Sequence, residues 1–310
     1  MQRSTKIAVA GATGRVGWPV VEILESRGYD VVPISRSLGV DVITGAGLDQ
    51  ALTGVETIID VSTGPSPDQQ AATEFFATAT RNLQEAGERA GVRRLVVVSI
   101  VGIDEFEGGY NAAKVAHERA ALAGPIPARI VRAAQFHEFV EELMRWGTQG
   151  DVCYVWKMRT QLVSARTVAE ALVELATAPD SEFDAAETTE VAGPREERLA
   201  EAARLVAERR GESVRIEESS DPSDPDSERY ANGAALPGPD AKLAGPTFEE
   251  WLDATVLAGR ASGLPTSTPK LGDGSCISWA PMMISAAGSS GDWRSSTVSS
   301  MVTCIPSTST

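Results

Sequence analysis

The sequence has few cysteines, few histidines and a deficit of positive charge, and it contains no long apolar run. Its 310 residues include three cysteines, two histidines and 28 lysines and arginines against 43 carboxylates, which gives a formal net charge of −15. The cysteines have no zinc-binding spacing, so we expect no metal. The acidic balance argues against nucleic acid or an anionic membrane as a partner. No apolar run reaches the roughly 18 residues of a membrane helix.

The rest of the composition is typical of a globular protein. Hydrophobic residues make up 42% of the chain and charged residues 23%, which suits a sizeable core. The first strand is expected at residues 6–10, and no apolar region of a signal peptide precedes it. We therefore expect a cytoplasmic protein, and the sequence leaves its oligomeric state open.

Short β-branched runs alternate with helical stretches in the first part of the chain. Expected strands are residues 6–10, 31–35, 57–61, 95–99 and 128–132. Helices with apolar periodicity fall between them, for example at 16–27 and 70–90. Strands that alternate with helices form a parallel sheet covered on both faces. We therefore predict an α/β fold with a doubly wound, Rossmann-like sheet.

The pattern is looser after residue 134. Helices are expected at 136–146, 167–178 and 195–210, and a short strand at 213–216. Thr167 is the expected cap of the second helix, and residues 219–228 are predicted to be a solvated acidic loop. Residues 265–310 hold 12 serines and 6 threonines but only four charged residues. This composition, without periodicity, predicts a disordered tail.

Three glycines follow the first expected strand and open the first helix, in the pattern G-x-x-G-x-x-G. Glycine permits a tight turn and lets the backbone approach a pyrophosphate. The free N–H groups at a helix N-terminus attract the anion. We therefore predict that a dinucleotide binds at Gly11, Ala12, Thr13, Gly14, Arg15, Val16 and Gly17.

The residues after the second strand indicate which dinucleotide binds. NAD-binding proteins usually carry an acidic residue there, which holds the ribose 2′-hydroxyl. This chain has Ser35, Arg36 and Ser37 instead. Arg36 can pair with a 2′-phosphate, and Arg15 in the glycine turn can add a second cation. We therefore favour NADP(H) over NAD(H).

A serine, a tyrosine and a lysine follow at positions that suit the reduction of a carbonyl. Ser99 ends the fourth expected strand, and Tyr110 and Lys114 have the i, i+4 spacing that puts two side chains on one helix face. Tyrosine is a poor acid–base group at neutral pH, but a nearby ammonium lowers its pKa. We expect Tyr110 to give the proton and Ser99 to hold the substrate oxygen. Lys114 is expected to lower the pKa of Tyr110 and to hold the nicotinamide ribose.

Several segments resemble the NmrA-like branch of the atypical short-chain dehydrogenases/reductases, which is common in actinobacteria. They are GATGRVG at 11–17, VSIVGI at 98–103, Tyr110 with KVAHE at 114–118, RAAQFHEF at 132–139, AGPRE at 192–196 and GPTFEEWL at 245–252. The likeness covers about residues 5–258. It implies a segment near 160–192 that returns to the sheet and a small substrate lobe. We therefore assign residues 1–133 to an NAD(P)-binding domain, 134–259 to a substrate lobe and 260–310 to the tail.

The resemblance leaves two functions open. Some NmrA-like proteins are reductases, whereas others sense the redox state of the cofactor and regulate transcription without turnover. The second kind usually lacks the tyrosine, and Tyr110 is present here. We therefore expect an NADPH-dependent oxidoreductase for a small carbonyl or quinone-type molecule, with a non-catalytic NADP(H)-sensing regulator as the alternative.

We also predict where three further polar residues lie. His117 is expected on the surface of the helix that carries Lys114, and Asn82 at a polar position of the helix at 70–90. The resemblance implies that His137 lines the substrate pocket, and a packed or capping role is equally open.

Overall fold

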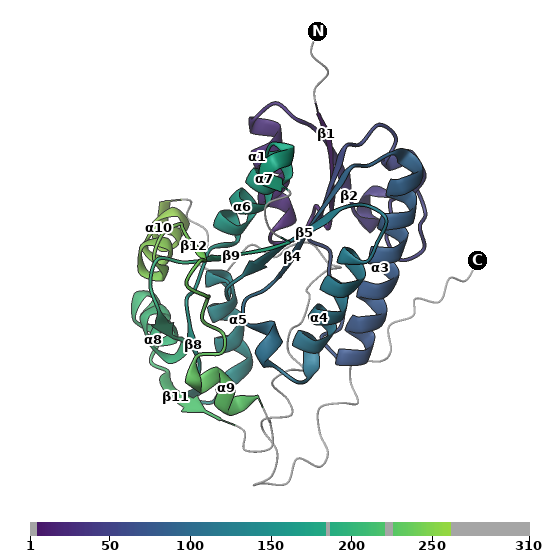
Figure 1. The fold of residues 1–310 in the computed structure, drawn as a ribbon. Coiled ribbons are helices and arrows are strands. Elements are labelled where there is room, and N and C mark those ends of the chain that lie inside the picture. The colour runs from purple at the N-terminus through teal and green to yellow at the C-terminus, as the bar shows by residue number, and fades with distance from the viewer. Residues whose placement is uncertain (1–4, 184–186, 221–225, 262–310) are drawn as a thin grey trace, which may run out of the picture.

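The computed structural model describes residues 5–183, 187–220 and 226–261. Its centre is a parallel seven-stranded sheet (Figure 1). In spatial order the strands are β12 (Lys242–Leu243), β9 (Thr188–Ala192), β5 (Ala128–Ala133), β4 (Arg94–Ile100), β3 (Thr57–Asp60), β1 (Lys6–Ala10) and β2 (Asp30–Ile34). The order reverses at β1, whose neighbours are β2 and β3. Ligands of such sheets bind beyond the carboxyl ends of the strands at this reversal.

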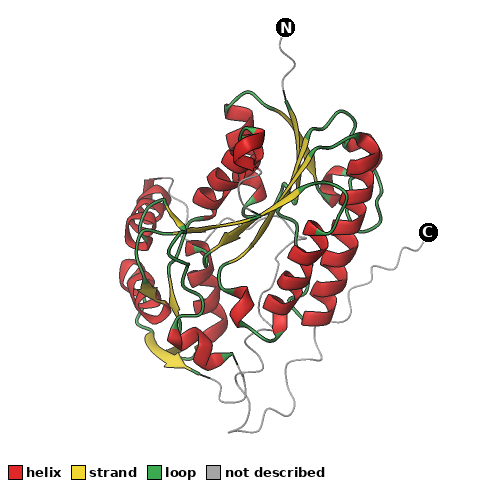
Figure 2. Cartoon of the chain, in the orientation of Figure 1, coloured by secondary structure: helices red, strands yellow, loops and turns green. Residues whose placement is uncertain are grey.

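Helices cover both faces of the sheet (Figures 1 and 2). On one face lie α3 (Gln69–Ala90) and α4 (Gly109–Leu122), and on the other α1 (Gly17–Ser26), α6 (Ala165–Thr177) and the short α7 (Asp180–Phe183). Leu95 and Val97 of β4 belong to one core and Val96 to another, because successive side chains of a strand point to opposite faces. The expected doubly wound fold is confirmed.

A further hydrophobic core lies beside the sheet, and we call the elements around it the lobe. They are α5 (His137–Gly147), β6 (Thr148–Gln149), β7 (Val152–Trp156), β8 (Arg159–Thr160), β10 (Glu197–Arg198), α8 (Leu199–Arg210), β11 (Arg215–Ser219), α9 (Ser227–Asn232) and α10 (Phe248–Ala261). Strand β7 pairs in parallel with β11, and β8 pairs antiparallel with β10. Buried Leu143, Val155, Val206 and Phe248 from four of these elements meet in the core.

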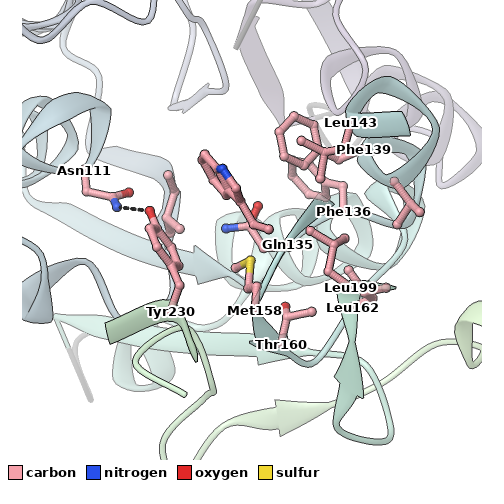
Figure 3. Close-up of a pocket in the computed structure, with 13 residues that line it drawn as sticks. Asn111, Gln135, Phe136, Phe139, Leu143, Met158, Thr160, Leu162, Leu199 and Tyr230 are labelled. Carbon is pink, nitrogen blue, oxygen red and sulfur yellow. Dashed lines mark hydrogen bonds between the residues drawn. The ribbon is translucent and has the colours of Figure 1, made fainter. Parts of the chain in front are cut away.

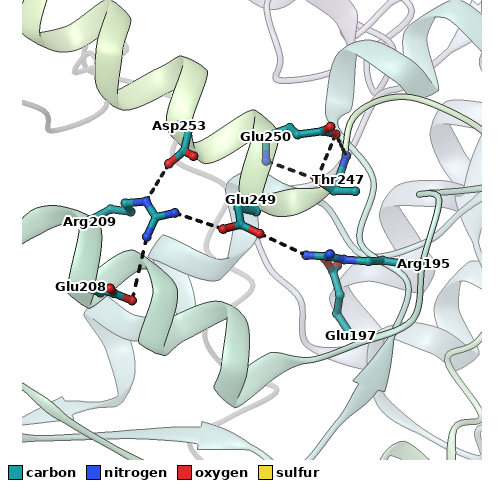
Figure 4. Close-up of polar contacts among 8 residues, drawn as sticks. All are labelled: Arg195, Glu197, Glu208, Arg209, Thr247, Glu249, Glu250 and Asp253. Carbon is teal, nitrogen blue, oxygen red and sulfur yellow. Dashed lines mark hydrogen bonds and ion pairs between the residues drawn. The ribbon is translucent and has the colours of Figure 1, made fainter.

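Charged contacts fasten α10 to α8 at the surface of the lobe (Figure 4). Arg209 of α8 donates to Asp253 at 2.7 Å and to Glu249 at 3.1 Å, both on α10. Thr247 and Glu250 cap the start of α10 reciprocally, because each accepts a hydrogen bond from the backbone N–H of the other. These contacts fix the end of the described chain against the lobe.

Boundaries differ from expectation mainly in the lobe. Helix α6 begins at Ala165, not at 167, because the hydroxyl of Ser164 caps it by accepting from the N–H of Thr167 at 3.1 Å. Helix α8 begins at Leu199, since the two residues before it pair with β8. The expected strand at 213–216 is β11, shifted towards the C-terminus. The loop expected at 219–228 overlaps β11 at Ser219 and α9 from Ser227 on, and its residues 221–225 lie outside the described part of the chain. The expected tail from residue 262 on lies outside the described residues.

Candidate cofactor and substrate site

The glycine turn has the backbone that the sequence predicts. Gly11 has a φ of +82°, and a Cβ there would lie 2.8 Å from the carbonyl oxygen of Val61. A Cβ on Gly17 would overlap the carbonyl oxygen of Gly11. A side chain at Gly11 would therefore push the turn away from the segment after β3, and one at Gly17 would push α1 away from the turn.

The outer side of the turn fits a pyrophosphate. Helix α1 begins without a side-chain cap. In its first turn Trp18 and Val20 donate to the carbonyls of Gly14 and Val16 and Pro19 has no N–H, so the N–H of Gly17 is the donor there that can face an anion. A Cβ on Gly14 would meet one neighbouring atom within 4 Å, the oxygen of Gly11 at 3.2 Å, and otherwise faces open space. The hydroxyl of Ser62, beside Gly11, is buried and interacts with the carboxylate of Asp60 at the end of β3.

Arg36 lies next to this turn. The carbonyl oxygen of Ile34 accepts from the N–H groups of Gly11 at 3.0 Å and Ala12 at 3.3 Å, which brings the end of β2 to the turn. Arg36 is exposed, and among the described residues it makes no ion pair. Arg15 is arranged differently from expectation, because its guanidinium pairs with Glu142 of α5. That pair joins the glycine turn to the lobe.

Tyr110 lies in the first turn of α4 and is buried, with 3% of its surface exposed. Its hydroxyl is 3.1 Å from the hydroxyl of Thr63, and its ring packs edge-on against Phe76. Burial raises the pKa of Tyr110 above its ordinary value, and the hydrogen bond with Thr63 opposes this only in part. The sequence predicted a pKa lowered by Lys114, and that prediction is wrong for this arrangement, because Lys114 faces other partners.

Lys114 is buried one helical turn further on. Its Nζ donates to the carbonyl oxygen of Val98 at 2.7 Å and lies 2.9 Å from Nδ1 of His117. The same nitrogen lies 4.6 Å above the ring of Phe76, a cation–π contact. Burial lowers the pKa of Lys114 to about 8, although the carboxylates of Asp60 and Glu118 oppose the shift.

His117 is fully packed, so the expected surface position is wrong. It is 1% exposed and stacks on Phe76, with ring centroids 4.4 Å apart. Its Nε2 lies 3.6 Å from a carboxylate oxygen of Asp60, at the end of β3. Burial and the charge of Lys114 lower the pKa of His117 to about 4. Asp60 was not expected in the site; its signal in the sequence is a lone carboxylate at the end of an apolar strand.

Ser99 is placed in β4 with its side chain buried. Only 3% of its surface is exposed, and its hydroxyl has no hydrogen-bond partner among the described residues. Val98, whose carbonyl holds Lys114, directly precedes it. The structure thus brings Ser99, Tyr110 and Lys114 to the same region of β4 and α4, with the tyrosine hydroxyl on Thr63.

A mostly apolar pocket opens between the sheet and the lobe (Figure 3). It encloses about 530 Å³ of empty space, part of it open to solvent. Its walls come from Ile100, Asn111, Gln135, Phe136, Phe139, Val140, Leu143, Trp156, Met158, Thr160, Leu162, Leu199 and Tyr230. These residues include the chain neighbours of Ser99 and Tyr110, but not Ser99, Tyr110 or Lys114 themselves. Ile100 also packs against the cluster that contains Tyr110, so it connects the two places.

The polar side-chain groups of the pocket are uncharged, and they include the indole N–H of Trp156. Asn111 donates to the hydroxyl of Tyr230 at 2.8 Å, which links α4 to α9 across the pocket (Figure 3). Gln135 and Thr160 supply the other polar groups, and the wall contains no charged side chain. His137 packs instead between Phe248 and Trp251 of α10, and Asn82 donates to the carbonyls of Val42 and Ile43. Within residues 5–183, 187–220 and 226–261, no group of side chains has the composition of a metal site.

The two buried histidines predict a loss of stability in mild acid. Burial lowers the pKa of His117 and of His137 to about 4, whereas histidine in an unfolded chain titrates near 6.5. Between these pH values the unfolded chain binds more protons, so stability falls as pH falls, by up to about 1.4 kcal/mol per pH unit for each histidine. Urea unfolding between about pH 6.5 and 5 measures the slope. His137→Leu should remove about half of it, and a flat stability curve would contradict the prediction.

Comparison with known proteins agrees with this geometry. Residues 11–179, more than half of the chain, match the model of a family described as NAD(P)H-binding. No curated protein sequence matches the chain. Among the described residues no helix is long and apolar enough to span a membrane.

Solved structures share the fold at low sequence identity. MoeE5, in complex with UDP-glucose and NAD, is 19% identical with a TM-score of 0.65, over 83% of this chain and 99% of its own. A UDP-N-acetylglucosamine 4-epimerase from Bacillus cereus is 17% identical with a TM-score of 0.63, over 86% and 99%. A short-chain dehydrogenase/reductase superfamily protein from Agrobacterium tumefaciens with bound NAD is 19% identical with a TM-score of 0.60, over 83% and 98%. The chain therefore belongs to the NAD(P)H-binding family and has the Rossmann-like fold of the short-chain dehydrogenases/reductases.

Proposed function

We propose that the protein is an NADPH-dependent oxidoreductase that transfers hydride to a small, uncharged carbonyl or quinone-type substrate. The observation that carries this proposal is the uncharged pocket beyond the carboxyl ends of β4 and β5, joined to the glycine turn by the ion pair of Arg15 with Glu142. In this proposal residues 1–133 bind the cofactor, and the lobe holds the substrate.

The pocket wall favours such a substrate over a nucleotide sugar. MoeE5 carries UDP-glucose in its solved complex, and a nucleotide diphosphate is held by cationic side chains or helix N-termini. The wall here has no lysine or arginine and is dominated by aromatic and aliphatic side chains. A flat, uncharged molecule with one or two polar atoms matches this surface, with the amides of Asn111 and Gln135 as its hydrogen-bonding partners.

The chain's own residues have distinct roles in the proposed reaction. NADPH, when bound, supplies the hydride. Tyr110 gives a proton to the oxygen that becomes negative, and its raised pKa keeps the phenol protonated at neutral pH. Lys114 holds the nicotinamide ribose, and the free hydroxyl of Ser99 orients the substrate oxygen. These roles require the substrate to reach from the pocket past Ile100, which lines it, to Tyr110, against whose cluster Ile100 packs.

One observation favours the second candidate, a non-catalytic NADP(H)-sensing regulator of the NmrA type. Tyr110 is 3% exposed, its hydroxyl lies 3.1 Å from that of Thr63, and it does not line the pocket. A sensor needs cofactor binding and a protein partner, but no reachable acid.

A paired measurement separates the candidates. Cofactor binding is titrated with NADPH and NADH, and oxidation of the bound form is followed by the loss of nicotinamide absorbance with a panel of quinones, aryl ketones and UDP-sugars. We expect turnover with one or more of the uncharged aromatic acceptors. Tight NADPH binding without turnover on any acceptor would favour the sensor, and turnover with UDP-sugars alone would overturn the proposed substrate class.

Arg36 provides the test of cofactor preference. Arg36→Ala should weaken NADPH binding by about 1–3 kcal/mol, as for the loss of a charged hydrogen bond, and leave NADH binding nearly unchanged. Isothermal titration with both cofactors measures the difference. Arg27→Ala, at an exposed arginine just after the C-terminal end of α1, is the matched control. Equal losses for NADPH and NADH would remove Arg36 from the 2′-phosphate.

A further inference from the structure

Lys114, His117 and Asp60 form a buried polar network. Nζ of Lys114 contacts Nδ1 of His117 at 2.9 Å, and Nε2 of the same ring lies 3.6 Å from a carboxylate oxygen of Asp60. All three residues are less than 5% exposed. Three linked titratable groups in a core are costly unless each charge is compensated. The function proposed above gives Lys114 a role but uses neither His117 nor Asp60.

The contacts determine which ring nitrogen of His117 carries the proton. An ammonium only donates, so Nδ1 of His117 must accept from Lys114 and cannot be protonated. The proton of the neutral ring is then on Nε2, which faces Asp60. The other oxygen of Asp60 accepts from the N–H of Ser62 at 2.9 Å, so this carboxylate is fixed on both sides. The polar network therefore joins ammonium to imidazole by a hydrogen bond and imidazole to carboxylate by a longer electrostatic contact.

Phe76 of α3 packs against two members of this polar network. Its ring stacks on the imidazole of His117 with planes 10° apart, and the same ring lies under Nζ of Lys114. Glu118 also affects the ammonium electrostatically, but both of its oxygens accept from Arg132, at 2.9 and 2.7 Å. Of these two carboxylates, that of Asp60 is therefore the one linked to Lys114 through another side chain, the imidazole of His117.

We propose that His117 and Asp60 are positioning residues for Lys114, which hold its ammonium group, charged, at the carboxyl end of β4. Two of the three N–H donors of Lys114 are used by Val98 and His117. The third has no hydrogen-bond partner among the described residues and is available for a ribose hydroxyl; this last step rests on the proposed function. Protonation of Lys114 then links cofactor affinity to pH.

The titration of Lys114 can be followed directly. The chain has five lysines, so NMR of protein with isotope-labelled lysine ε-carbons gives five signals, and Lys114→Met assigns the relevant one. We expect the Lys114 signal to titrate near pH 8. In Asp60→Asn, which keeps an acceptor for Ser62, the midpoint of Lys114 should fall by about one pH unit.

Two substitutions of His117 separate positioning from packing. Asn can place an acceptor near the position of Nδ1, so His117→Asn should keep the Lys114 midpoint closer to that of the parent than His117→Leu, which removes the acceptor. Asp30→Asn, at an exposed carboxylate, and His137→Asn, at the other buried histidine, should leave the midpoint unchanged. If Asp60→Asn and His117→Leu remain folded and do not move the midpoint, the proposal is wrong. A loss of melting temperature without a shifted midpoint indicates packing alone and overturns it as well.

Cofactor binding gives the functional readout. The dissociation constant for NADPH should rise in the parent protein as pH increases through about 8, and in Asp60→Asn this rise should begin about one pH unit lower. Lys114→Arg keeps the charge at all these pH values, so its profile should be flat. If NADPH does not bind at any pH, the proposed function fails, while the lysine titration still decides the role of His117 and Asp60. A parent profile that is flat while Lys114 titrates would contradict the link to the ribose.

Discussion

Tyr110→Phe should lower turnover of the best carbonyl substrate by about 10²–10⁴-fold, the usual contribution of a positioned acid–base group. The substitution removes the hydroxyl and keeps the ring that packs on Phe76, so fold and cofactor binding should survive. Rates are measured under single-turnover conditions, which separate hydride transfer from product release. A carbonyl substrate is needed, because a quinone depends less on a protein acid.

Thr63→Val is the matched control for this variant. It removes the same hydrogen bond, 3.1 Å between the two hydroxyls, but leaves the phenol in place. If Tyr110 is the proton donor, Thr63→Val should retain turnover within about tenfold, because a neutral hydrogen bond contributes only about 0.5–1.5 kcal/mol. Near-full activity of Tyr110→Phe would remove Tyr110 from the mechanism. Equal losses in both variants would assign the effect to the Thr63 contact.

The fold was predictable because its signals are local. Strands β1, β3, β4 and β5 begin within one residue of the expected positions, since β-branched apolar runs in a sheet covered on both faces depend little on distant partners. The glycine turn was predictable for the same reason, because the positive φ of Gly11 and the close approach at Gly17 belong to one short segment.

The lobe and the inner part of the site were not predictable in the same detail. Strand β7 pairs with β11, about sixty residues away along the chain. The local sequence of either strand does not indicate which strand it pairs with. His117 was assigned to the surface because α4 has a weakly amphipathic sequence, yet Phe76 and Asp60 from α3 and β3 enclose it. The pKa of Tyr110 was predicted in the wrong direction because burial, a tertiary property, outweighs the charge of a neighbour.

Gly17→Ala should damage both the fold and the cofactor site. The added Cβ would overlap the carbonyl oxygen of Gly11 and lie 2.8 Å from Cα of Ala12. Both are backbone atoms, which cannot rotate away, so the start of α1 must shift. Overpacking of this kind typically costs about 1–3 kcal/mol, measured here as a lower midpoint of urea unfolding. Because the same shift moves the N–H groups at the start of α1, affinity for NADPH should fall by about tenfold or more.

Gly14→Ala separates the two effects of Gly17→Ala. The new methyl group would meet only the oxygen of Gly11, at 3.2 Å, and would otherwise point into open space. Gly14 does not have a positive φ, so the unfolding free energy should change by less than about 1 kcal/mol. A methyl group there stands where the backbone must approach a pyrophosphate, so binding of NADPH and NADH should weaken together, unlike in Arg36→Ala. If Gly14→Ala binds both cofactors as the parent does, the pyrophosphate does not lie on this side of the turn.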